Sequence, residues 1–248
     1  MTDSSPPVDI RPALAALFVE IGRDLTKATS ADEVLETLSR SAYAALPSAE
    51  HAAISRRRHG RFETVAATSE LPQQIDEIQF RLGSGPGVDA LLDRGVYRAD
   101  ELSADRRWPQ FGREVTSRFG IHSMLSAQLD LEDDELHAAL NLYAGPPHAF
   151  DESDETTAVL LATHGALAIS AARRQQKVDN LEHALTTSRL IGAATGVLMA
   201  TYKVTDDQAF DLMRVASQAS HRKLRDIAAE VVASGTIELP APPEPRRL

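Results

Sequence analysis

The chain contains 248 residues, no cysteine and a formal net charge of −10 at pH 7. This length favours one large domain or two small ones. The lack of cysteine excludes a thiol nucleophile, a thiolate ligand for zinc or an iron–sulfur cluster, and a disulfide framework of the secreted kind. We expect no signal peptide, because no basic region precedes an apolar one at the N-terminus. The longest apolar stretch, 158–172, is interrupted by polar residues and too short to span a membrane, so we expect a cytoplasmic protein.

The acidic charge is concentrated in the first part of the chain. Residues 1–172 hold 15 Lys and Arg against 27 Asp and Glu, whereas residues 173–235 hold nine against seven. This asymmetry favours two modules with different partners. The alternative is that the acidic charge only keeps a large domain in solution.

The first elements are helical. Residues 1–9 are polar and contain prolines, and we expect them to be disordered. Apolar residues at helical spacing predict a helix from Leu14 to Leu25 and a second one after Ser30. Ser30 and Glu33 have the spacing of a capping box, in which the glutamate reaches back. A change to a period of two then predicts a hairpin with its turn at residues 58–60.

A second hairpin is predicted at residues 124–143, with an acidic turn at 132–134. Both arms alternate apolar and polar residues, which is typical of an antiparallel pair with one apolar face. Between the hairpins we expect a turn at Gly83–Gly87, a short strand at Val96 and Tyr97, and a helix that begins around Trp108 and ends at Gly120. The first part is therefore an α+β domain of about 160 residues.

From Ser153 the pattern is helical. We expect five apolar residues to face the first domain: Val159, Leu160, Ala166, Leu167 and Ile169. A stripe with alternating steps of three and four follows, and it predicts a coiled-coil contact and a homodimer. The stripe consists of Val178, Leu181, Leu185, Ser188, Gly192, Thr195 and Met199.

The C-terminal part is predicted to be a three-helix bundle. Thr205 and Gln208 have the spacing of a second capping box, and Ser220 is the expected cap of a last helix that ends at Gly235. Residues 240–248 are rich in proline and charge, and we expect a disordered tail.

Motifs of catalysis are missing from the sequence. Gly83–Gly87 is followed by no Gly-Lys-Ser or Gly-Lys-Thr and preceded by no strand, so a structural turn is favoured over a phosphate site. The eight histidines lack metal-binding spacing, no Gly-x-Ser-x-Gly motif occurs, and the acidic run 130–135 lacks the glycine of a calcium loop. We therefore expect no catalytic residue, no metal and no cofactor, and hence no enzyme.

One basic cluster needs an explanation. Arg222, Lys223 and Arg225 stand at the start of the last predicted helix, where cations oppose the helix macrodipole. A bound polyanion would explain this placement, since phosphates would meet both the side chains and the free helix amides. The alternative is an ordinary basic turn offset by Asp226 and Glu230.

The segment from Leu181 to Val232 resembles an ANTAR domain, the RNA-binding three-helix module of transcription antitermination regulators. The residues that carry this resemblance are Ala184-Leu185, Ser188-Arg189, Ile191-Gly192, Ala194, Gly196 to Met199, Ala209-Phe210, Leu212, Ala216, Arg222 to Leu224 and Ala228.

The region from Leu14 to Ala172 resembles a GAF domain of the kind that is fused to ANTAR domains in actinobacteria. Four segments carry this second resemblance: Gly85 to Ala90, Arg107 to Phe111, Ser123 to Ser126 and Ala139 to Tyr143.

Together the resemblances imply an organisation in successive parts. They imply a GAF sensor domain at 10–172 with an antiparallel sheet of about six strands flanked by helices, a helical connector at 173–190 and an ANTAR domain at 181–235. The implied function is binding of paired RNA stem-loops in nascent transcripts, so that a terminator hairpin cannot form. Two bundles on one dimer would suit paired loops.

The resemblance also implies site residues. RNA contacts are expected at Arg189, Thr195, Arg222, Lys223 and Arg225. Many family members have Gln-Ala-Lys-Gly where this chain has Ala193-Ala194-Thr195-Gly196, so a cation that would contact phosphate is missing. Relatives of this GAF type often have cysteine at the position of Gly87.

The GAF domain is the expected input, with an unidentified small-molecule ligand under its sheet. We expect the pocket near Tyr97, Trp108 and Phe111, because aromatic walls suit such sites; the alternative is that they are core residues. A methionine sulfoxide reductase is excluded by the missing cysteines. A second hypothesis remains, in which the chain is a ligand-sensing dimeric signalling module and its C-terminal bundle binds protein rather than RNA.

Overall fold

The computed structural model describes residues 11–131 and 136–239, and the chain divides into two compact units between Gln175 and Gln176. The termini that we expected to be disordered and the acidic turn at 132–134 lie outside the described residues. Within the described residues, no helix is long and apolar enough to cross a membrane.

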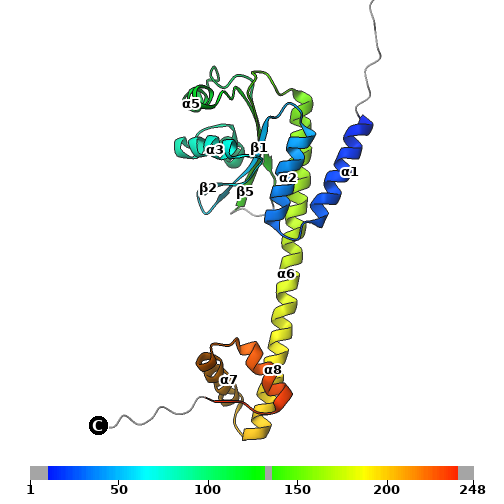
Figure 1. The fold of residues 1–248 in the computed structure, drawn as a ribbon, viewed down its shortest axis with the longest axis vertical. Helices are drawn as coiled ribbons and strands as arrows, with labels where there is room; N and C mark the ends of the chain where they lie inside the picture. The colour runs from blue at the N-terminus through cyan, green and yellow to red at the C-terminus, as the bar shows by residue number, and fades with distance from the viewer. Residues whose placement is uncertain (1–10, 132–135, 240–248) are drawn as a thin grey trace, which may run out of the picture. The chain divides into compact units, whose positions relative to one another are not determined.

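The first unit is built on a five-stranded antiparallel sheet with the order β2-β1-β5-β4-β3 (Figure 1). Both predicted hairpins are present, and together with the short strand β3 they account for every strand in the described residues. The sheet has one strand fewer than the resemblance implied. The strands are β1 (His51–Arg58), β2 (Arg61–Ala67), β3 (Val96–Ala99), β4 (Ser123–Leu129) and β5 (Leu136–Ala144).

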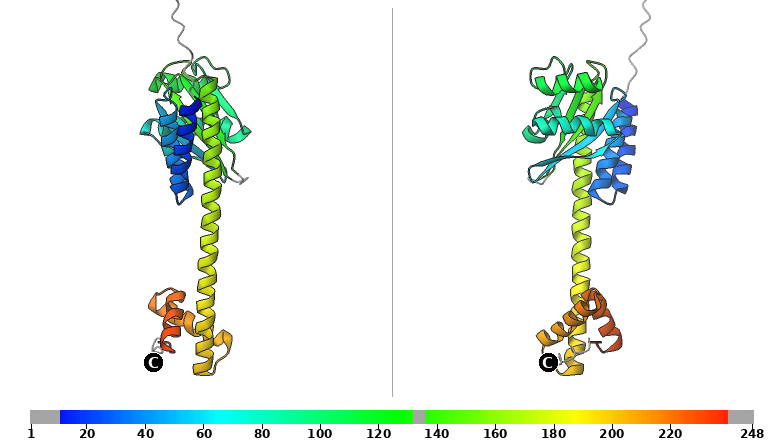
Figure 2. Two further views of the ribbon diagram at one scale, coloured as in Figure 1. Left: turned by 90° about the vertical axis from the view of Figure 1, so that its right-hand side faces the viewer. Right: turned by 60° about the vertical axis from the view of Figure 1, so that its left-hand side comes forward.

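Helices cover both faces of this sheet (Figures 1 and 2). On one face, Leu38 of α2 and Leu161 of α6 share a core with Leu142 of β5. On the other, Ile75 of α3 and Phe111 of α5 share a core with Tyr143 and other residues of the sheet. The helices of the first unit are α1 (Arg11–Lys27), α2 (Ala31–Ala45), α3 (Glu70–Leu82), α4 (Pro86–Asp93), α5 (Pro109–Phe119) and the first part of α6 (Glu152–Tyr202).

The expectation of a single apolar face for the second hairpin is therefore wrong. Met124, Ser126, Asn141 and Tyr143 belong to the face that alternates with the apolar one, and all four are fully buried. The physical reason is that β4 and β5 lie inside the sheet and that helices cover both of its faces.

Helix boundaries agree with the expected caps in most places. The Ser30 hydroxyl accepts a bond from the Glu33 amide at 3.2 Å, and the Glu33 carboxylate accepts from the amide of Thr29, the residue before the cap, at 2.7 Å. These bonds from Thr29 lower the pKa of Glu33. Helix α5 ends at Gly120 as predicted.

The glycine-rich segment forms a turn, as predicted, and it joins two helices that the sequence analysis missed. Gly83 ends α3 in the left-handed conformation, with φ +63°, and Pro86 is the first residue of α4. Helix α4 has only eight residues, and the glycines of the turn dominate the sequence pattern there.

The assignment of the domain-facing side of α6 is partly wrong. Ala166 and Ile169 are buried as expected, but Val159, Leu160 and Leu167 are exposed. The buried face instead begins at Thr157 and Ala158 and repeats at helical spacing through Leu161, Ala162 and Ala166.

The second unit packs α7 (Asp206–Ser220) and α8 (Leu224–Ser234) on the C-terminal part of α6 (Figure 2). Its core includes Leu198, Met213, Ile227 and Val231. The capping box of Thr205 and Gln208 is present, and α8 ends at Gly235 as predicted.

The predicted cap at Ser220 is wrong. Ser220 is the last residue of α7, and its hydroxyl donates to the carbonyl of Ala216 at 2.6 Å. His221 takes the left-handed conformation that ends α7, with φ +54°, so α8 begins only after Lys223.

Candidate functional site

The turn between α7 and α8 fixes the position of the basic cluster in the second unit. The hydroxyl of Ser217 donates to the carbonyl of Arg222 at 2.6 Å, and the Arg222 amide donates back to the carbonyl of Ser217 at 3.2 Å. The carbonyl of Lys223 accepts from the amide of Asp226 and starts α8. Lys223 therefore occupies the cap position, and Arg222 and Arg225 stand on either side of it in sequence.

The cations of this basic turn differ in their partners. Arg222 Nη1 lies 2.8 Å from Glu230 Oε2, and Arg225 Nε lies 3.3 Å from Asp226 Oδ1. Lys223 and Arg189 are exposed, and in the described part of the chain neither side chain has an ion-pair partner. Exposed ion pairs contribute little, so phosphate groups can replace these carboxylates at low cost.

Thr195 lies in a different environment from the other expected RNA contacts. Its side chain is only 5% exposed, and its hydroxyl donates to the carbonyl of Ile191 at 2.9 Å. The structure brings Arg222, Lys223 and Arg225 into one turn, and it leaves little of Thr195 for an RNA to contact.

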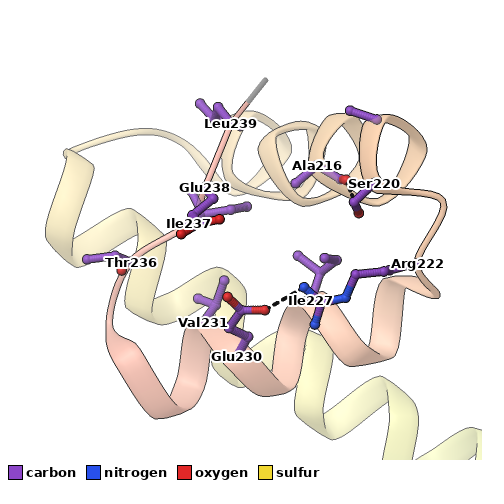
Figure 3. Close-up of a pocket in the computed structure, with 11 residues that line it drawn as sticks. Ala216, Ser220, Arg222, Ile227, Glu230, Val231, Thr236, Ile237, Glu238 and Leu239 are labelled. Atoms are coloured by element: carbon purple, nitrogen blue, oxygen red, sulfur yellow. Dashed lines mark hydrogen bonds and ion pairs between the residues drawn. The ribbon is translucent and has the colours of Figure 1, made fainter. Parts of the chain in front are cut away.

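A cavity of about 250 Å³ lies next to the basic turn (Figure 3). Helices α7 and α8 and the segment Thr236–Leu239 line it. Apolar side chains such as Ile227, Val231 and Ile237 form much of its wall, and the ion pair of Arg222 with Glu230 stands at one side. No sequence pattern pointed to this cavity, because the Thr236–Leu239 segment has no regular structure.

The first unit holds a buried polar cluster between its sheet and α3. Asp76 is fully buried and accepts four hydrogen bonds, all from uncharged groups. The donors are the hydroxyls of Ser55 at 2.6 Å, Thr64 at 2.7 Å and Tyr143 at 2.5 Å, and the amide of Gln79 at 3.0 Å.

Burial dominates the ionisation of this cluster. Desolvation raises the pKa of Asp76, and the four donors lower it by less. Desolvation and the neighbouring Asp76 carboxylate raise the pKa of Tyr143. Burial therefore opposes the charged form of both groups.

Two buried atoms beside this cluster have no hydrogen-bond partner in the described residues, Ser126 Oγ and Asn141 Oδ1. They lie on paired positions of β4 and β5, and the start of α4 lies over them. A Cβ on Gly87 would lie 2.8 Å from Asn141 Oδ1, so only glycine fits at this position without movement of the amide. The Gly87 amide donates to Gln79 Oε1 at 2.9 Å, which connects α4 to the cluster.

The sequence analysis missed this cluster. Asp76 and Gln79 lie on α3, which we did not predict, although Ile75 and Ile78 have helical spacing. Ser126 and Asn141 had been placed on the polar face of the hairpin. The spacing of Ile75 and Ile78 is the signal that could have found α3, whereas the alternation of β4 and β5 gives no sign that Ser126 and Asn141 are buried.

The three residues expected to line the ligand pocket come together in the structure. The rings of Tyr97 and Trp108 are 6.2 Å apart, and Phe111 belongs to the same buried cluster. Trp108 is 1% exposed, and its indole nitrogen donates to Asp89 at 2.7 Å. The Arg107 guanidinium lies 4.1 Å above the Trp108 ring. Residues of an ordinary hydrophobic core, the alternative to a ligand pocket, pack in the same way.

The described residues contain no group of three or more His, Asp or Glu that could hold a metal ion.

Comparison with known families assigns most of the chain. Residues 28–170 match the model of the GAF domain, and residues 179–232 match the model of the ANTAR domain. No curated protein sequence matches the chain.

Solved structures resemble the first part of the chain. Free methionine-R-sulfoxide reductase from Neisseria meningitidis is 12% identical, with a TM-score of 0.53 over 71% of this chain and 98% of its own. The GAF domain of a phosphoenolpyruvate-protein phosphotransferase from Acinetobacter is 14% identical, with a TM-score of 0.52 over 66% and 98%. The corresponding domain from Coxiella burnetii is 19% identical, with a TM-score of 0.51 over 66% and 96%. At these identities the likeness concerns the fold alone.

Proposed function

Because the chain belongs to the GAF domain family and carries an ANTAR domain after its GAF domain, we propose that it is an RNA-binding regulator that acts by transcription antitermination. The GAF domain is its sensor, and the ANTAR bundle holds paired stem-loops of nascent RNA. The observation that carries this proposal is the exposed basic turn of Arg222, Lys223 and Arg225 at the start of α8. In this proposal the protein binds RNA while it is being transcribed, and it therefore acts in the cytoplasm.

The basic turn has the chemistry that RNA loops need. Phosphates attract its cations and also the free amides at the N-terminus of α8, and Arg189 adds an exposed cation in the same domain. Contacts of this kind position an RNA without specifying its sequence. With Thr195 buried, the three cations of the basic turn and Arg189 supply the phosphate contacts in this proposal.

A homodimer would present two bundles to two loops. Val178, Leu181 and Leu185 are exposed on α6 at heptad spacing, so a second copy of the helix would bury them. If the two helices run parallel, Lys177 and Glu182 stand at positions that face each other across the seam with opposite charge. Paired sites on one dimer bind two linked loops more tightly than either loop alone.

The input is a small molecule bound by the GAF domain. The polar cluster around Asp76 and the unpartnered oxygens of Ser126 and Asn141 support a ligand under the sheet, next to the aromatic residues Tyr97, Trp108 and Phe111. The reductase activity named for the Neisseria protein is not part of the proposal, because a cysteine-free chain lacks a thiol to carry it.

The proposal is tested by fluorescence anisotropy of the full chain with a double stem-loop RNA, titrated with salt. The RNA is selected with this chain from a pool of double stem-loops with randomised loops. A single stem-loop and a duplex DNA of equal charge are the controls. We expect preference for the two-loop RNA and weaker binding as salt rises. Equal, weak binding to all three would contradict RNA recognition.

A second function is favoured by one observation. Glu230 and Asp226 already pair with Arg222 and Arg225, and apolar residues such as Leu185, Met199 and Phe210 are exposed in the same unit. In this alternative the bundle binds a protein. Partners that co-purify with the chain after ribonuclease treatment, together with no RNA preference, would support it.

A further inference from the structure

The cavity beside the basic turn is large enough to hold part of a ligand (Figure 3). It measures about 250 Å³ and is closed on three sides by α7, α8 and the segment Thr236–Leu239. Ala219 of α7 lines it and is exposed, so the cavity opens to solvent. Six of its lining residues are apolar and five are polar, namely Ser220, Arg222, Glu230, Thr236 and Glu238. Apolar walls that carry placed polar groups are the usual form of a ligand pocket.

The polar groups of this cavity offer both kinds of hydrogen bond. Arg222 contributes donors and Glu230 contributes acceptors, and their charged ends lie 2.8 Å apart. Both side chains are about half exposed, at 49% and 46%, so a ligand can reach them. In Figure 3 this pair faces the same space as Ile227 and Val231, which can contact the flat face of a ring.

An unstacked nucleobase matches this combination. Loops of RNA are recognised through bases that leave the stack, lie against side chains and form hydrogen bonds along their edges. Arginine donates to acceptor atoms of a base, and a carboxylate accepts from a base amino group. Arg222 and Glu230 lie 2.8 Å apart, so the edge of one base can reach both groups.

The position of the cavity favours a base over a free metabolite. Lys223 and Arg225 follow Arg222 within three residues and are exposed, and neither lines the cavity. A loop whose phosphates contact these two cations would bring an adjacent base to the opening. An uncharged metabolite would gain nothing from them.

We propose that this cavity receives one unstacked base of the RNA loop, and that Glu230 contacts this base. The proposal rests on the RNA-binding function above and adds a specificity-determining residue to it. In this proposal Glu230 strengthens RNA binding. A carboxylate that only competed with phosphate for Arg222 would weaken it.

The two roles of Glu230 predict opposite effects. The substitution Glu230→Gln removes a negative charge next to the basic turn, so a competing carboxylate would give tighter RNA binding when it is removed. Glutamine keeps an acceptor oxygen but loses the charge that strengthens the bond, so removing a carboxylate that accepts from a base would weaken binding about tenfold. Asp226→Asn is the matched control, because it removes a carboxylate that pairs with Arg225 outside the cavity. It should leave RNA affinity unchanged or raise it.

The experiment measures anisotropy of the full chain with the selected double stem-loop RNA and with a set of RNAs that each lack one loop base. We expect that removing one particular base from each loop weakens binding by the wild type about tenfold. For the RNA that lacks this base, Glu230→Gln should cause no further loss of affinity. Ala219→Leu, which narrows the cavity and leaves every charge in place, should give the same loss. Circular dichroism melting of each variant checks that the bundle stays folded.

Three results would overturn the inference. The first is that Glu230→Gln binds the RNA more tightly than the wild type does. The second is that this substitution changes affinity equally for the intact and the abasic RNAs. The third is that no single abasic position in the loop weakens binding. Any of these, found while Lys223→Ala still weakens binding, would leave the RNA-binding function in place. If the pool yields no RNA, the proposed function fails and this inference fails with it.

Discussion

Asn141 Nδ2 donates to the hydroxyl oxygen of Ser55 at 2.8 Å, and this bond determines which way the Asn141 side chain faces. Ser55 gives its single hydroxyl proton to Asp76, so it can only accept from Asn141. The amide oxygen of Asn141 consequently faces Gly87, and no group in the described residues donates a hydrogen bond to it. A buried carboxylate thus fixes the orientation of a group two hydrogen bonds away.

Gly87→Ala should destabilise the first unit. The added Cβ would lie 2.8 Å from Asn141 Oδ1 and 3.1 Å from Gln79 Nε2, so the hydrogen-bonded network must shift. We expect a loss of about 1–3 kcal/mol in the free energy of unfolding, measured by urea denaturation.

Gly22→Ala is the matched control for this substitution. Gly22 lies within α1, and an added Cβ would meet nothing within 4 Å. Alanine is favoured over glycine in a helix by about 1 kcal/mol, so the control should be neutral or stabilising. Equal losses at both positions would show that Gly87 is not constrained by the cluster.

The burial of Asp76 predicts a pH dependence of stability with a definite sign. Its pKa in the folded chain is raised above the ordinary 3.8, so folding favours the protonated carboxyl group. The stabilising contribution is fully present below the ordinary pKa and is lost as the pH rises through the folded pKa. The cause is the desolvation of the carboxylate.

Asp76→Asn isolates this contribution, because asparagine resembles the neutral acid and does not titrate. We expect the free energy of unfolding of the wild type, minus that of the variant, to fall as the pH rises from acid to neutral. Urea titrations at a series of pH values measure this difference. A difference that rises with pH would mean that the four donors stabilise the carboxylate more than burial destabilises it.

Periodicity and caps predicted most of the fold. The two hairpins, the long helix and the bundle all follow from apolar spacing, and Thr205, Gly120 and Gly235 mark boundaries through local hydrogen bonds and left-handed geometry. Ser220 misled the prediction, because the same local chemistry allows a serine to close one helix or to start the next. Whether His221 enters the left-handed region depends on the packing of both helices.

The candidate sites were predicted less completely. The basic turn was visible because its cations are adjacent in sequence. The Asp76 cluster combines residues from β1, β2, α3 and β5, and it depends on the cover that α3 and α4 give to the sheet. A polar residue on an alternating strand looks solvent-exposed until both faces of the sheet are known to be covered, as Asn141 shows.

The proposed dimer contact along α6, at Val178, Leu181 and Leu185, can be tested by reversing the charges beside it. If the α6 helices pair in parallel, Lys177→Glu places like charges opposite each other at two symmetry-related positions. At about 0.5 kcal/mol for each pair, the dimer dissociation constant should rise about fivefold. The double variant Lys177→Glu with Glu182→Lys should restore the wild-type value. Sedimentation equilibrium measures both, and a double variant as weak as the single one would argue against this register.

The basic turn should determine the salt dependence of RNA binding. Arg222→Ala with Lys223→Ala removes two cations, and each phosphate contact on a single strand contributes about 0.7 to the slope of log affinity against log salt. We therefore expect weaker binding and a slope reduced by about 1 to 2, measured by anisotropy between low and physiological salt.

The control for the basic turn is Arg214→Ala, which removes one exposed cation from α7. Arg214 pairs with Asp211 at 2.8 Å and does not belong to the turn. If RNA follows only the overall charge of the bundle, this variant should reduce the slope by about half as much as the double variant. If the phosphates contact the turn itself, the slope should stay at the wild-type value. A slope that is unchanged in the double variant would place the RNA on another face of the bundle, because losing two contacted cations must reduce counterion release.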